Sequence, residues 1–182
     1  MADIIRGQGK IAITVEPQAL KDLFSTLRAL PTEAQQEVRD KAQPMSQKLA
    51  RALSVAAAFS AAPPQAILVA RSISTPRDRL IRVDVGGSKK VGRPYGGERN
   101  SRGKLTNRQA APAGALLWGS EHGSRGGVDR AGRNQGRRFV KPYLKGGYWI
   151  NPTIDANIQE VANEYTEMVK AIVRRVKLDG GE

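Results

Sequence analysis

The residues with the most obvious chemical potential are Ser120, Glu121, His122 and Ser124, which lie within one short stretch. A hydroxyl, an imidazole and a carboxylate are the groups of nucleophilic hydrolysis, in which a base activates the hydroxyl and a third group orients the base. No third group has a fixed place in this stretch, and the glycines around it favour a pliant loop. We therefore predict that His122 is a surface histidine in a turn and that the stretch holds no catalytic residue.

Other catalytic and cofactor chemistries lack their ligands. The chain of 182 residues has no Cys and a single His, which excludes disulfides, thiolate metal sites and sites that need two imidazoles. Its acids are sparse and scattered, so neither a catalytic carboxylate pair nor a calcium or magnesium site is indicated. Residues 86–89 lack the spacing of a phosphate loop. We expect no cofactor, no metal and no enzymatic activity.

Positive charge is concentrated in one part of the chain. The net charge is +13, and residues 87–147 hold 14 bases, 3 acids and 14 of the 19 glycines. We predict a single domain, residues 1–182, in which residues 87–147 form a basic, glycine-rich extended region with little core of its own. Such a region is either a solvated insertion or a surface for polyphosphate or an acidic protein. The candidate DNA-facing or partner-facing residues are Lys89, Lys90, Arg93, Arg99, Arg102, Lys104, Arg108, Arg125, Arg130, Arg133, Arg137 and Arg138.

The elements before this region are mostly helical. Residues 10–15 alternate like a short strand, and from Pro17 the apolar spacing predicts a helix that ends before Pro31. Thr32 with Gln35 is a capping-box pattern, which opens a second helix that continues to Phe59. Pro44 lies inside that helix and should kink or divide it.

A small sheet and a last helix are also predicted. Residues 67–74 and 79–86 are typical of a β-hairpin with a Pro-containing turn, although the first arm fits the end of a helix equally well. Residues 113–120 are an apolar island, and residues 138–144 are a strand or a docking segment. Asn151 and Pro152 suit the N-cap and first position of an amphipathic helix that ends at the glycines 180 and 181. The predicted fold class is therefore α+β: N-terminal helices, a small antiparallel sheet carrying the basic region, and a C-terminal amphipathic helix.

This order of elements resembles the neck and tail-completion (tail-component) proteins of long-tailed double-stranded DNA phages. Residues 117–120, Leu-Trp-Gly-Ser, are similar to a Val-Glu-Phe-Gly-Thr-like segment of that family. Residues 149–153, Trp-Ile-Asn-Pro-Thr, are similar to the Pro-Phe-Leu-x-Pro-Ala-like segment that opens the family's last helix. The resemblance covers roughly residues 34–178. The chain departs from the family in Leu117, where an acid is usual, and in the length of its basic region.

The resemblance implies a structural virion protein of the head–tail junction, assembled in the host cytoplasm, that is a neck, tail-terminator or tail-completion subunit. It implies a homo-oligomeric ring of about six copies between the head-closure or connector protein and the tail tube, with double-stranded DNA in its lumen. No membrane partner is expected, because no apolar run approaches a membrane span. Trp118, Tyr148 and Trp149 would be anchors of subunit contacts or of the core. The alternative is a nucleic-acid-binding accessory protein that uses residues 87–147 without sequence preference.

Overall fold

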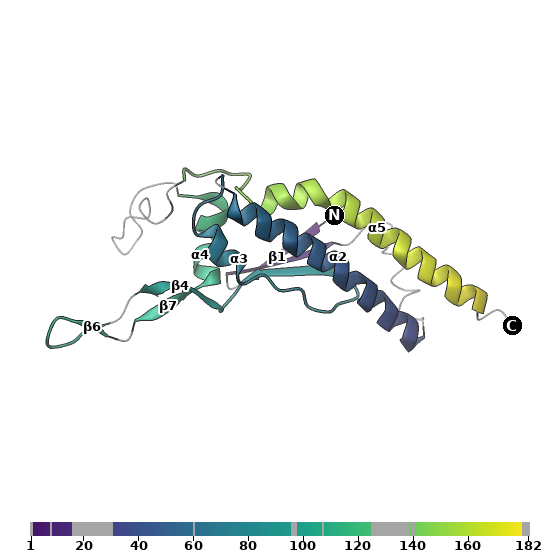
Figure 1. Cartoon of the computed structure of the whole chain (residues 1–182), viewed down its shortest axis with the longest axis horizontal. Coiled ribbons are helices and arrows are strands. Elements are labelled where there is room, and N and C mark those ends of the chain that lie inside the picture. Colours follow the sequence, from purple (N-terminus) through teal and green to yellow (C-terminus); the bar gives the residue numbers. More distant parts are fainter. Residues whose placement is uncertain are drawn as a thin grey trace.

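The structure of the chain is a computed structural model that describes residues 2–7, 9–15, 31–59, 61–95, 98–106, 108–124, 139 and 141–179. It is a mixed fold of helices and small antiparallel sheets, which confirms the α+β prediction. Two long helices, α2 (Thr32–Ala58) and α5 (Ile150–Asp179), lie side by side and run in opposite directions (Figure 1). The helix predicted over residues 17–30 lies outside the described residues.

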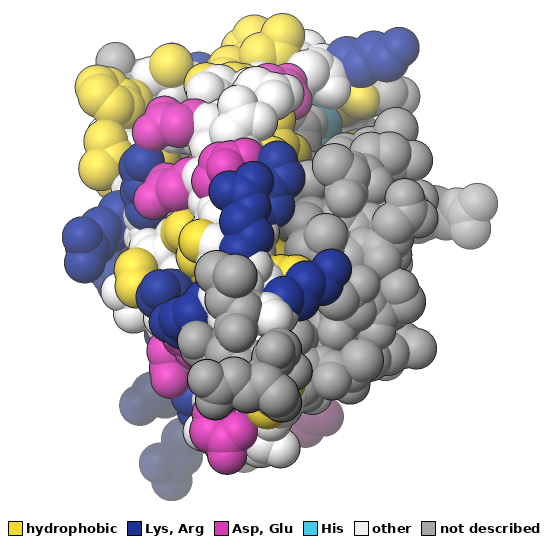
Figure 2. All heavy atoms as spheres, turned by 90° about the vertical axis from the view of Figure 1, so that its right-hand side faces the viewer, with side chains coloured by type: hydrophobic (Ala, Val, Ile, Leu, Met, Phe, Trp, Pro, Cys, Tyr) yellow, Lys and Arg dark blue, Asp and Glu magenta, His cyan; other side chains and the backbone are white. Residues whose placement is uncertain are grey.

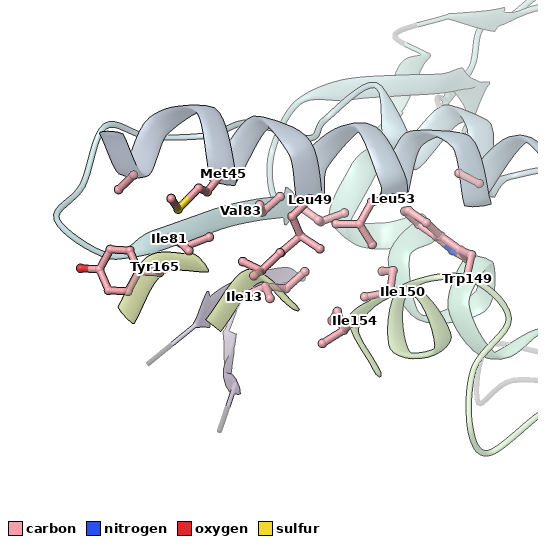
Figure 3. Close-up of a cluster of buried hydrophobic side chains, with 14 of the residues drawn as sticks. Ile13, Met45, Leu49, Leu53, Ile81, Val83, Trp149, Ile150, Ile154 and Tyr165 are labelled. Atoms are coloured by element: carbon pink, nitrogen blue, oxygen red, sulfur yellow. The ribbon is translucent and has the colours of Figure 1, made fainter. Parts of the chain in front are cut away.

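A three-stranded antiparallel sheet packs against the two helices. Its strands are β1 (Ala2–Gly7), β2 (Lys10–Val15) and β3 (Ile81–Gly86), with β2 in the centre and Ile13 opposite Val83. The strand predicted at residues 10–15 is therefore confirmed. Ile13 and Val83 are fully buried, and the labelled side chains of α2, β2, β3 and α5 point into one apolar cluster (Figure 3).

The predicted hairpin over residues 67–74 and 79–86 is wrong in its first arm. That arm forms the short helix α3 (Ala66–Ala70), the alternative that the sequence left open, and only Ser74 and Asp84 pair as an isolated bridge. Ala66 and Val69 are buried at helical spacing. The main partner of β3 is instead β2, which lies far away in the sequence. A short apolar run does not distinguish the two states, and in the fold this segment packs as a helix against α4 and α2.

Helix α2 begins where it was predicted but for a different reason. Pro31 occupies the N-cap position and no side chain caps the helix, so the predicted capping box at Thr32 and Gln35 is wrong. The helix also continues through Pro44 without a division. Pro44 removes a single backbone hydrogen bond, whereas the buried residues on both sides of it, including Val38 and Leu49, pack along the same stripe.

The basic region is partly built of regular structure. β4 (Lys90–Tyr95) pairs with β7 (Gln109–Pro112), and β5 (Glu98–Arg99) pairs with β6 (Leu105–Thr106). The apolar island becomes helix α4 (Ala113–His122), whose Leu116 and Leu117 join the core. Residues 141–144 form no strand, and Pro142 makes only an isolated bridge to Ser124. Residues 125–138 and 140 lie outside the described residues.

Ion pairs join the exposed sides of the two long helices. The carboxylate of Glu37 on α2 accepts hydrogen bonds from Arg175 on α5 and pairs with Lys41 at 2.9 Å. Nearer the middle of α2, Lys48 pairs with Glu160 of α5 at 2.7 Å. The hydrogen bond from Arg175, followed by that from Lys41, lowers the pKa of Glu37 to about 2.

The Glu37 contact gives stability a defined pH dependence. Since the pKa of Glu37 is lower in the folded chain than its ordinary value of 4.5, its contribution is present above that value and is lost as the pH falls toward 2. Thermal unfolding followed by circular dichroism should show this loss in the parent chain, and Glu37→Gln should reduce it. Glu33→Gln, which removes an exposed acid of the same helix, is the matched control and should retain the parental acid sensitivity.

The core prediction concerns Leu53, which is fully buried on α2. Leu53→Ala should lower the free energy of unfolding by about 2–5 kcal/mol, because it leaves a cavity between the helices and the sheet. Arg51→Ala, two residues earlier on the same helix at an exposed position, should change it by less than about 0.5 kcal/mol. Urea unfolding measures both values, and equal losses would contradict the assigned core.

Candidate functional site

Glu121 lies at the end of α4 and binds the start of α5. Its Oε2 accepts hydrogen bonds from the backbone N–H groups of Trp149 (3.3 Å) and Ile150 (2.7 Å), and its Oε1 accepts one from Asn151 (2.9 Å). These N–H groups have no partner within the helix, and they carry the positive end of the helix dipole. Glu121 therefore caps α5, and the prediction that Asn151 is the N-cap is wrong.

The environment of Glu121 pulls its pKa in two directions. The residue is 2% exposed, and burial raises the pKa of its carboxyl group, while the three N–H donors favour the charged form and oppose that rise. Gly147 has a φ of +83°, and a Cβ there would overlap Oε1 of Glu121. The glycine thus provides the turn and the space that this cap requires.

His122 is buried, so the prediction of a surface histidine in a pliant loop is wrong. The residue is 5% exposed, and its Nδ1 lies 2.9 Å from the carbonyl oxygen of Leu144. The glycines misled the sequence interpretation, because Gly119 lies inside α4 and allows close packing rather than a loop. A Cβ at Gly119 would overlap the ring of the buried Phe139.

The hydroxyl, imidazole and carboxylate of this stretch bind backbone groups rather than one another. Ser120 donates its hydroxyl to the carbonyl of Leu117 at 2.8 Å, His122 contacts the carbonyl of Leu144, and Glu121 caps α5. Each group holds a turn or a helix end in place. Their arrangement accounts for the burial of all three side chains.

The three predicted aromatic anchors have different places. Trp149 is 1% exposed and belongs to the core, and Tyr148 is half-buried and donates its hydroxyl to the carbonyl of Pro142 at 2.7 Å. Trp118 is 55% exposed, and its ring centroid lies 4.2 Å from that of His122. The ring of Tyr143 also stacks on that of His122, with the two ring centroids 5.8 Å apart. The indole of Trp118 is therefore exposed at the surface and rests against the ring of His122.

Exposed apolar side chains gather at one end of the helical body. Ile67 of α3, Trp118 of α4 and Leu144 before α5 are all exposed. At the end of α2, Val55 and Phe59 line a groove of 540 Å³ together with residues of the first turns of α5. Figure 1 shows that these helix ends meet where β4 and β7 leave the body. We call these five exposed side chains, Val55, Phe59, Ile67, Trp118 and Leu144, the apolar end.

The two small ribbons form an arm that extends from the same end, away from α2 and α5 (Figure 1). We define the arm as residues 88–112. Asn100 organises its tip, where Oδ1 accepts hydrogen bonds from the backbone N–H groups of Arg102 (3.1 Å) and Lys104 (3.0 Å). The arm brings together seven of the predicted DNA-facing or partner-facing residues: Lys89, Lys90, Arg93, Arg99, Arg102, Lys104 and Arg108. The other five, Arg125, Arg130, Arg133, Arg137 and Arg138, lie outside the described residues.

Sequence reasoning missed two residues that organise this region. Glu121 has a signal, because it is one of only three acids in the basic region and it follows an apolar run. Asn100, followed by Ser101, Arg102 and Gly103, has the composition of a tight turn. In neither case does the sequence show the backbone groups that the side chain binds.

The part of the chain that the structure describes holds neither a metal-ligand cluster nor a membrane-spanning helix. No group of three or more His, Cys, Asp or Glu side chains in these ranges could hold a metal ion. Likewise, none of the helices described here is long and apolar enough to cross a membrane. No family model matches the chain, and neither the curated proteins nor the solved structures gave a match.

The Glu121 cap can be tested by one isosteric change. Glu121→Gln puts an amide NH₂ group where a carboxylate oxygen accepts a backbone N–H, so it should cost about 2 kcal/mol or more of unfolding free energy. Glu98→Gln, the same change on the exposed arm, should cost less than about 0.5 kcal/mol. Urea unfolding measures the free energy of unfolding of both variants. If Glu121→Gln left this free energy unchanged, the Glu121 cap would not stabilise the fold.

Proposed function

We propose that the chain is a structural subunit of a phage head–tail junction, of the neck, tail-terminator or tail-completion kind. In this proposal its copies form a ring that surrounds the DNA channel. The observation that carries the proposal is the contact between α4 and α5, the two helices that hold the segments of the family resemblance. Residues 117–120 lie in α4 and residues 149–153 open α5, and Glu121 joins them through the backbone N–H groups of residues 149–151.

The apolar end supports self-assembly. Five large apolar side chains lie exposed there, with Phe59 at 65% and Trp118 at 55%. Apolar surface that a monomer leaves in water is typical of a protein–protein interface, and Trp is enriched among the residues that carry binding energy. In the proposed ring these residues contact a neighbouring copy. The remaining faces meet the head-closure or connector protein and the tail tube in the virion.

The arm favours a second candidate function. Its seven cations also suit a nucleic-acid-binding accessory protein that works as a single copy and contacts phosphates without sequence preference. The two candidates differ in self-assembly, because only the ring needs the apolar end to be covered by another copy.

Light scattering of the purified chain distinguishes the two candidates. The ring predicts a mass of about six times the 19.7 kDa of one chain. Trp118→Ser should shift the population toward monomer, because the exposed indole anchors the contact. Arg174→Ser, at an exposed position on the last part of α5, is the control and should leave the mass unchanged. A monomeric parent chain at every protein and salt concentration would contradict self-assembly.

A further inference from the structure

We propose that the arm binds the phosphate backbone of double-stranded nucleic acid without sequence preference. The inference deepens the proposed function and rests on it for its setting, in which the duplex is the one that crosses the ring. The binding itself requires a single copy of the chain. An experiment can therefore contradict DNA binding by the arm without contradicting the ring, and the reverse.

The first observation is the charge of the arm. Residues 88–112 contain seven Lys and Arg residues and one acid, Glu98, so the arm carries +6 of the chain's +13. The described bases of the arm are exposed along its whole length, from Lys89 at the root to Arg102 and Lys104 at the tip. A row of exposed cations attracts a polyanion and releases its counterions on contact.

The second observation is how differently cations are paired on the body. Lys10 and Arg82 bind the buried carboxylate of Asp84 at 2.6 and 3.0 Å, and hydrogen bonds from both help to lower its pKa against the effect of burial. Among the described residues, seven cations of the body have carboxylate partners: Lys10, Lys41, Lys48, Arg77, Arg82, Lys170 and Arg175. Figure 2, which faces the end opposite the arm, shows basic and acidic side chains next to each other.

Six of the seven arm cations have no comparable pairing in the part of the chain that the structure describes. Lys90, Arg93, Arg102 and Lys104 have no carboxylate partner there, and Lys89 and Arg99 bind only the backbone carbonyls of Arg71 and Gly103. Backbone carbonyls leave the positive charge uncompensated. The arm therefore offers cations that an external anion can neutralise.

The third observation is the shape that presents these cations. The arm is a two-stranded ribbon that leaves the body, and a ribbon of this kind fits the major groove of a B-form duplex between its two phosphate rows. The turn built on Asn100 fixes the backbone at Arg102 and Lys104. The tip cations thus start from an ordered backbone, which lowers the entropy lost on binding.

The composition of the arm favours a nucleic acid over an acidic protein. Protein interfaces have apolar or aromatic anchors at their centre, and none of the exposed large apolar side chains of the described residues lies on the arm. Tyr95 is the one aromatic residue of its sequence, whereas proteins that hold single strands stack successive bases on several rings. A duplex backbone needs only cations.

The test is a titration of the full chain with a fluorescent duplex of about 24 base pairs, followed by anisotropy from about 50 to 300 mM salt. The variant is Arg99→Gln, Arg102→Gln and Lys104→Gln together. It should bind at least about tenfold more weakly at 100 mM salt, and the slope of log Kd against log salt should fall by about 2. The parent chain should bind two unrelated duplex sequences within about twofold of each other.

The matched control removes the same charge from the body, through Arg51→Gln, Arg174→Gln and Lys177→Gln at exposed helical positions. Its affinity for the duplex should stay within about threefold of the parent, because these residues lie on α2 and α5. A second arm variant at the root, Lys90→Gln with Arg93→Gln, should weaken binding in the same direction. Circular dichroism melting of every variant verifies that the body stays folded.

Three outcomes would overturn the inference. Equal losses in the arm variant and the control would assign binding to net charge alone. If the parent chain did not bind the duplex at about 50 mM salt, nucleic acid would be excluded as the partner of the arm. If the chain bound polyglutamate instead, the partner would be an acidic protein. Light scattering in the same buffers separates the two proposals. A monomer that binds DNA through the arm contradicts the ring only, and a ring that ignores DNA contradicts the arm only.

Discussion

The fold depends on one buried carboxylate. Glu121 is nearly inaccessible to water, so its charge requires partners, and it finds them in three backbone N–H groups at the start of α5. An uncapped helix start inside a protein would be costly, and so would an unpaired buried acid. Each group relieves the cost of burying the other. The contact ties the basic region to the C-terminal helix across nearly thirty residues of sequence.

The same contact explains how an exposed arm is held by a small body. Strand β7 passes directly into α4 at Ala113, and α4 ends at the carboxylate that caps α5. Leu116 and Leu117 of α4 enter the core, and the ring of Phe139 packs on Gly119. The arm therefore continues a helix that is fixed at both its apolar side and its C-terminal end. Force applied to the ribbon reaches α5 through covalent and buried contacts rather than through a hinge.

The sequence predicted elements whose evidence is local. The strand at residues 10–15, the extent of α2 and the long last helix all follow from periodicity, and the structure confirms them. Prediction from the sequence failed where contacts with residues distant in the sequence determine the local structure. The segment containing Val69 became a helix that packs against α2 and α4, and Asn151 lost the capping position to Glu121. The glycines near His122 looked like a loop, although Gly119 serves close packing. The contacts that decide these cases join residues that only the folded chain brings together.

The separation of charge within the chain has a consequence for how it approaches a partner. Among the described residues, the long helices α2 and α5, whose acids and bases balance, and a strongly positive ribbon at one end form an electric dipole, whose positive pole is the tip near Arg102. In the field of a polyanion such a molecule experiences a torque before any contact forms. It rotates until the ribbon leads, so that successive molecules reach the same polyanion with one polarity. Orientation is then set during diffusion, at a range limited by the Debye length, and collisions with the wrong end become rare.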